Sequence, residues 1–127
     1  MPEIGPNVEA SIGIFDSGVG GISFLVWAKE NLPAEDIIYF GDNVHAPYGE
    51  KTATEIKDLV RAGVRFLREK NVKAIVLACN TATAVAIEDL RRENPDFVWV
   101  GMEPEIKKPA FASRLINQTI VLTNQLI

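Results

Sequence analysis

Residues 74–83, with the sequence Ala-Ile-Val-Leu-Ala-Cys-Asn-Thr-Ala-Thr, decide the fold of this chain. The segment begins as a short apolar run, which is typical of a buried strand, and a helical pattern follows from about Thr81. The only cysteine, Cys79, therefore lies at a corner between a strand and a helix. In open α/β sheets such corners hold the ligand, so we expect a functional site there.

The same strand-to-helix unit recurs on both sides of this corner. We expect Ile22, Leu25 and Val26 to form the apolar stripe of a helix at 22–31. The strand that follows it, at 36–41, is expected to be buried. The alternation predicts an α/β fold, an open doubly wound parallel sheet of about four strands with helices on both faces. The apolar patterns predict strands at 11–15, 36–41, 74–78 and 97–101, and helices at 22–31, about 52–70 and about 81–93.

Length and composition indicate one domain of ordinary size. The chain has 127 residues, of which 47% are hydrophobic and 24% charged. We interpret 1–10 as a loose leader, 11–112 as the α/β domain and 113–127 as a divergent tail. The tail pattern fits a strand or an amphipathic helix equally well.

The charge pattern argues against several kinds of partner. The net charge is −4 and no cluster of Lys or Arg is present, so we expect no nucleic-acid partner.

No apolar stretch is long enough for a membrane span, and the first residues lack the basic region of a secretory signal. A single cysteine cannot form an internal disulfide, and this agrees with a location in the reducing cytoplasm. One histidine and one cysteine also argue against a metal site.

The predicted corners carry polar side chains. The carboxyl ends of parallel strands share one edge, so Asp16, Ser17, Asp42, Cys79 and Glu103 are expected to lie together. The amino termini of the following helices would attract a carboxylate or phosphate. A plainer interpretation stands beside each: Cys79 as a small buried hydrophobe, and the two aspartates as helix caps.

The loop after the second predicted strand is also polar. Tyr48, between Pro47 and Gly49, could form only a turn, and His45 is expected to lie on the surface rather than act as a catalyst.

Five motifs in order make the sequence resemble glutamate racemase, of the cofactor-independent aspartate/glutamate racemase family. The match runs from about 12 to 110. The motifs are Ile-Phe-Asp-Ser-Gly-Val-Gly-Gly at 14–21, Tyr-Phe-Gly-Asp at 39–42, Pro-Tyr-Gly at 47–49, Ala-Cys-Asn-Thr-Ala at 78–82 and Gly-Met-Glu-Pro at 101–104.

The resemblance implies interconversion of L- and D-glutamate without a cofactor, for the supply of peptidoglycan precursors. It implies two cysteines, one from each of two similar α/β domains, on opposite faces of the substrate. Cys79 corresponds to the first, and Asp16 to an aspartate that assists proton transfer. The substrate-binding positions that the resemblance implies are Asp16, Ser17, Pro47, Tyr48, Gly49, Asn80 and Thr81.

The chain departs from this pattern because it has no second cysteine. One hypothesis is that it is the amino-terminal half of a racemase, truncated or trimmed, and inactive alone. A second is a standalone module that binds a ligand or forms homo-oligomers. A third hypothesis is a one-cysteine enzyme of the same superfamily, such as a decarboxylase, because a decarboxylase needs to protonate its substrate on only one face.

Overall fold

The computed structural model describes residues 10–18 and 20–102. Its centre is a four-stranded sheet in the order β2-β1-β3-β4, and every neighbouring pair is parallel. The predicted fold class is confirmed. The strands are β1 (Ile12–Asp16), β2 (Ile37–Gly41), β3 (Ala74–Leu77) and β4 (Val98–Gly101).

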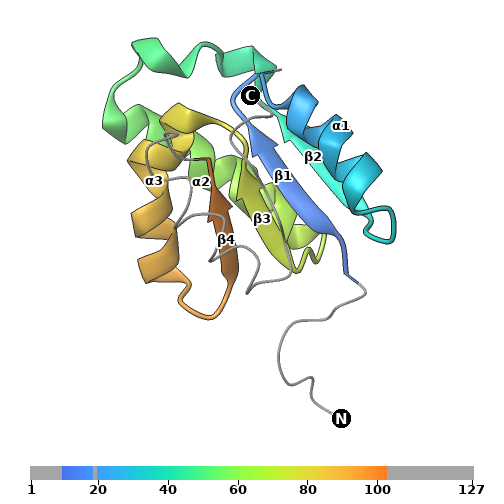
Figure 1. Cartoon of the computed structure of the whole chain (residues 1–127). Helices are drawn as coiled ribbons and strands as arrows, with labels where there is room; N and C mark the ends of the chain where they lie inside the picture. The colour runs from blue at the N-terminus through green and yellow to red at the C-terminus, as the bar shows by residue number, and fades with distance from the viewer. Residues whose placement is uncertain (1–9, 19, 103–127) are drawn as a thin grey trace.

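Helices cover both faces of this sheet (Figure 1). The helix α1 (Ile22–Asn31) packs on one face, while α2 (Ala53–Glu69) and α3 (Asn80–Glu93) pack on the other. Two single-turn 3₁₀ helices, η1 (Asn43–His45) and η2 (Tyr48–Glu50), connect β2 to α2. Alternate residues of the buried strands point to opposite faces, which gives two separate cores.

The sequence of α2 explains where this helix starts and which face it buries. Thr52 and Glu55 form a reciprocal capping box at its amino terminus, as their spacing predicts. The apolar stripe of α2 is buried at four positions, and a fifth apolar residue on the same face, Leu59, packs half-buried against the same core. The four buried positions are Ile56, Val60, Val64 and Leu67.

Two expectations from the sequence are wrong. The buried side chains of α1 are Phe24 and Ala28, whereas Ile22 and Val26 of the predicted stripe are exposed. The strand β2, one of the two edge strands of the sheet, is half-buried along its whole length rather than buried. Local apolar runs do not report the order in which strands pair.

Several predicted features lie outside the described residues: Glu103, the tail at 113–127 and all of the leader except Ala10. None of the helices in the described ranges is long and apolar enough to cross a membrane.

Candidate active site at the carboxyl edge of the sheet

The carboxyl ends of β1, β2 and β3 are joined by backbone hydrogen bonds that continue past the strands. The amide of Asp42 donates to the carbonyl oxygen of Asp16 at 2.9 Å. On the other side of β1, the amide of Ala78 donates to the carbonyl oxygen of Phe15 at 2.8 Å. The corners that carry the predicted site residues are therefore direct neighbours at one edge.

The Cys79 side chain is half-buried and has polar partners. It packs against the core under α2 and α3, and it is the N-cap residue of α3. Its Sγ accepts a hydrogen bond from the amide of Ala82 at 3.4 Å and one from the hydroxyl of Ser17 at 3.1 Å. The interpretation as a small buried hydrophobe is thus incomplete, because the sulfur is held by donors at a helix amino terminus.

The contact between Ser17 and Cys79 links the first and third corners across 62 positions of sequence. Both residues lie where a strand gives way to a polar turn or helix. The sequence predicted that these corners share an edge, and this hydrogen bond shows the two side chains in contact there.

The Asp16 carboxylate is buried, with 2% of the residue exposed. Its Oδ2 accepts from the amide of Gly21 at 2.6 Å and from the hydroxyl of Tyr39 at 2.5 Å. Gly21 is itself the N-cap residue of α1, and this helix has no side-chain capping bond, so Asp16 is not a helix cap although it binds the amide just before the helix. A Cβ at Gly21 would lie 2.9 Å from Oδ2 and 2.8 Å from the Cβ of Ala78, so this close approach requires glycine.

The Asp42 side chain organises the loop after β2. Its Oδ2 accepts from the hydroxyl of Tyr48 at 2.5 Å, and its Oδ1 lies 2.7 Å from Nδ1 of His45. Asp42 occupies the N-cap position of η1, as its interpretation as a helix cap predicts, but its side chain makes no capping bond to this helix. His45 is exposed, as expected.

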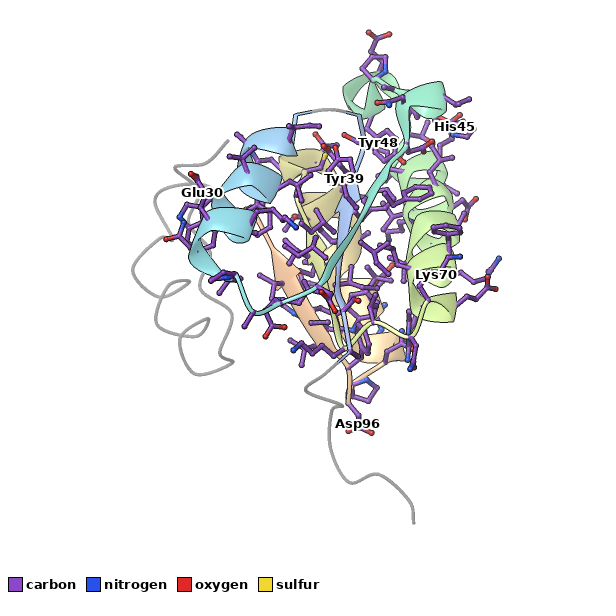
Figure 2. The ribbon with its side chains drawn as sticks, turned by 90° about the vertical axis from the view of Figure 1, so that its right-hand side faces the viewer. Glu30, Tyr39, His45, Tyr48, Lys70 and Asp96 are labelled. Carbon is purple, nitrogen blue, oxygen red and sulfur yellow. The ribbon has the colours of Figure 1, made fainter. Side chains whose placement is uncertain are left out.

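Tyr48 is more than a turn residue, because its side chain is buried and tied to the site. Burial, the hydrogen bond to Asp42 and the nearby charges of Asp42, Cys79 and Asp16 raise the pKa of Tyr48. The phenol therefore stays protonated and donates its hydrogen to Asp42. Figure 2 shows Tyr39 and Tyr48 toward the same end of the sheet, with Asp96 at the other end.

The remaining predicted positions surround this cluster with different exposure. Asn80 is exposed and Thr81 half-buried, and both lie in the first turn of α3 rather than at its cap, because Cys79 takes the cap position. Pro47 and Gly49 are exposed on either side of Tyr48.

Sequence reasoning missed Tyr39, which it treated as one of several strand residues. The hydroxyl of a tyrosine near the carboxyl end of a strand needs a hydrogen-bonding partner. The position of Tyr39 in the sequence could therefore have indicated a contact with the polar residues at that edge.

A groove of about 540 Å³ lies between the carboxyl-terminal halves of α2 and α3, away from Cys79. Its lining includes Arg61, Arg68 and Glu93, which are already engaged in polar contacts between the helices. No cluster of three or more His, Cys, Asp or Glu suitable for a metal ion occurs in the described ranges.

A parallel α/β sheet with a thiol, a buried carboxylate and helix amino termini at its carboxyl edge is the arrangement of small-molecule-binding α/β domains. Comparison with known proteins makes this more specific. The chain is related in sequence and in fold to the N-terminal part of glutamate racemases.

Two curated relatives show the sequence similarity. The chain is 57% identical over 96 residues to glutamate racemase of Clostridium novyi, covering 76% of this chain and 37% of the relative. It is 48% identical over 117 residues to that of Clostridium perfringens, covering 92% of this chain and 45% of the relative. The chain thus spans less than half the length of these relatives. No protein-family model matches the chain.

Solved structures show the same fold. Glutamate racemase of Escherichia coli, in complex with L-glutamate and the activator UDP-MurNAc-ala, matches with a TM-score of 0.70 and 42% identity, over 84% of this chain and 39% of that one. Glutamate racemase of Francisella tularensis, in complex with D-glutamate, matches with a TM-score of 0.70 and 37% identity. The match covers 74% of this chain and 36% of that one.

Proposed function

We propose that this chain provides one face of a cofactor-independent site for proton transfer at the α-carbon of glutamate, with Cys79 as the acid–base group. The observation that carries the proposal is the contact between Ser17 and Cys79, because it joins the thiol to the Asp16 corner at one edge of the sheet. Similarity to glutamate racemases, two of them solved with glutamate enantiomers, supports glutamate as the substrate.

The chemistry needs a base, an acid and a site for the carboxylate. The thiolate of Cys79 removes the α-proton, so the S–H bond forms as the C–H bond breaks and its electron pair stays on carbon. In the return step the thiol gives a proton back to the carbanion and becomes thiolate again. Amides at the start of α3 are placed to bind the α-carboxylate and stabilise the charge that develops there.

The other residues of the edge are proposed to bind the substrate. Asn80 and Thr81 are in the first turn of α3, where their side chains could hold the α-carboxylate. Asp16 would pair with the ammonium group or assist the proton transfer, and Ser17 would contact the substrate beside the sulfur. Pro47, Tyr48 and Gly49 would line the remaining side.

Inversion requires a second proton donor on the opposite face, and the 127 residues contain a single cysteine. We therefore expect the isolated chain to exchange the α-proton of glutamate with solvent without useful racemisation. An experiment in deuterated solvent separates proton exchange from racemisation. The ¹H NMR signal of the α-proton of L-glutamate should decay, while polarimetry shows that the configuration is retained.

The variant Cys79→Ala should abolish this exchange. Exchange that persists in Cys79→Ala, or no exchange by the parent chain, would contradict the proposed role of the thiol. Conversion of D- to L-glutamate that depends on Cys79 would contradict the expected lack of inversion.

We also propose a setting for this activity: the supply of D-glutamate for peptidoglycan, in the cytoplasm, by a self-associating protein. Large apolar side chains are exposed in the described part of the chain, including Val26 at 52% and Val44 at 88%. Such surface favours association. A molar mass by light scattering that stays monomeric at high concentration would rule out self-association.

A further inference from the structure

The two oxygens of the Asp16 carboxylate have unequal surroundings. Oδ2 accepts two short hydrogen bonds, from the Gly21 amide at 2.6 Å and from the Tyr39 hydroxyl at 2.5 Å. Among the described residues, Oδ1 accepts only from the Gly18 amide, at 3.4 Å. One oxygen is therefore anchored from two directions, and the other keeps most of its capacity to accept a hydrogen bond.

The Tyr39 ring reaches Asp16 because the surrounding backbone leaves room for it. Tyr39 pairs in register with Ile14, two residues before Asp16 along β1. A Cβ at Gly41 would lie 3.1 Å from Cε1 of Tyr39 and 2.8 Å from the carbonyl oxygen of Gly18. Glycine at this position thus lets the ring pass along the end of β2.

The Tyr39 hydroxyl has a single proton and two acceptors within reach, Asp16 Oδ2 at 2.5 Å and the Gly18 carbonyl at 3.1 Å. The shorter contact goes to the carboxylate, which is the stronger acceptor. Burial and the hydrogen bond to Asp16 raise the pKa of Tyr39, so the hydroxyl keeps its proton at any pH at which an enzyme works.

We propose that Tyr39 is a positioning residue for the proton-transfer site: it fixes the Asp16 carboxylate through Oδ2 so that Oδ1 is left to meet the substrate. This inference rests on the proposed function. Tyr39 itself would touch neither substrate nor thiol, and it acts through Asp16 alone. Without Tyr39 the carboxylate would keep the Gly21 contact to Oδ2 and the long Gly18 contact to Oδ1, and it would be held less firmly.

The variant Tyr39→Phe tests this role because it removes only the hydroxyl. The measurement is the α-proton exchange of L-glutamate in deuterated solvent by the 127-residue chain, across a range of glutamate concentrations, corrected for the folded fraction by circular dichroism. We expect the maximal exchange rate to fall about 10- to 100-fold, the scale of small misplacements in active sites, with little change in half-saturation by glutamate.

The split between maximal rate and half-saturation separates positioning from a structural role. In Tyr39→Phe the Asp16 carboxylate is still present but held less firmly, so the maximal exchange rate per folded molecule should fall while half-saturation by glutamate stays close to the parent value. The control is Trp99→Phe, which removes a donor to the carbonyl of Asn94 at the other end of the sheet. It should lower stability while leaving the maximal exchange rate per folded molecule unchanged.

A second replacement guards against a variant that fails to fold. Tyr39 replaced by p-aminophenylalanine keeps the ring and restores an N–H donor, so exchange should recover toward the parent rate. An active parent chain with an unchanged rate in Tyr39→Phe, or an equal fall in the rate per folded molecule in Trp99→Phe, would overturn the role of Tyr39. A parent chain without exchange would overturn the proposed function, and this inference with it.

Discussion

At the residue scale, buried hydroxyl groups hold the ends of the strands in place. Thr83 of α3 is 3% exposed, and its Oγ1 donates to the carbonyl of Leu77 at 3.2 Å and accepts from the amide of Met102 at 3.0 Å. One side chain thus binds the ends of β3 and β4 to the helix that begins at Cys79. The site depends on such contacts because the strands end where it begins.

Replacement of this hydroxyl should lower stability. Thr83→Val keeps the shape of the side chain but leaves the buried Met102 amide without its acceptor, which should cost about 1–3 kcal/mol in the free energy of unfolding. Urea denaturation followed by circular dichroism measures the change. The control is Thr54→Val on the exposed side of α2, where a change within about 0.5 kcal/mol is expected. Equal losses in both variants would argue against a special role of Thr83.

At the scale of elements, the distance between α2 and the sheet is set by a glycine. A Cβ at Gly63 would collide with the ring of Phe15 in β1 and would lie 3.0 Å from Cε1 of Phe40 in β2. The two aromatic rings stack with centroids 5.7 Å apart, and they fill the space under the helix. The helix therefore lies close to the strands that carry Asp16 and Asp42.

An added methyl group should disrupt this packing. Gly63→Ala should destabilise the protein by about 1–3 kcal/mol through overpacking, even though alanine favours the helix. Thermal denaturation compares it with Gly20→Ala, where a Cβ meets no atom within 4 Å. A variant Gly63→Ala as stable as the parent would show that α2 moves away from the sheet without penalty.

At the scale of the whole molecule, charged side chains connect the two helices on one face. Asp89 of α3 lies 2.9 Å from Nζ of Lys57 in α2, and Arg61 lies 2.7 Å from Glu93. Hydrogen bonds from Lys57 and Arg92 lower the pKa of Asp89 below its ordinary value of 3.8. The folded state therefore favours the charged carboxylate.

This linkage predicts how stability changes with acid. A group with a lowered pKa contributes stability above its ordinary pKa, and this contribution disappears as the pH falls through the folded-state value. The variant Asp89→Asn should have a lower urea midpoint than the parent at neutral pH. The gap should narrow as the pH falls below about 4. The exposed neighbour provides the control, since Glu88→Gln should show no such convergence. A gap that stays constant with pH would contradict the assignment.

The sequence alone determined the alternation of strands and helices, the helix bounds within one or two residues and the sheet edge at which the predicted site residues lie. These follow from local properties: apolar periodicity, the capping box of Thr52 and Glu55, and the fact that parallel strands all end at one edge. Motif order was also sufficient to point to the relatives of the chain.

Only the tertiary structure decided which strands lie at the two edges of the sheet, which face of α1 is buried and which partners the predicted site residues take. The edge position of β2, the burial of Phe24 instead of Ile22, and the bonds of Tyr39 to Asp16 and of Tyr48 to Asp42 all depend on groups distant in sequence or on the path of a loop. The pairing order and the path of the loop are set by packing over the entire fold, which no local pattern encodes.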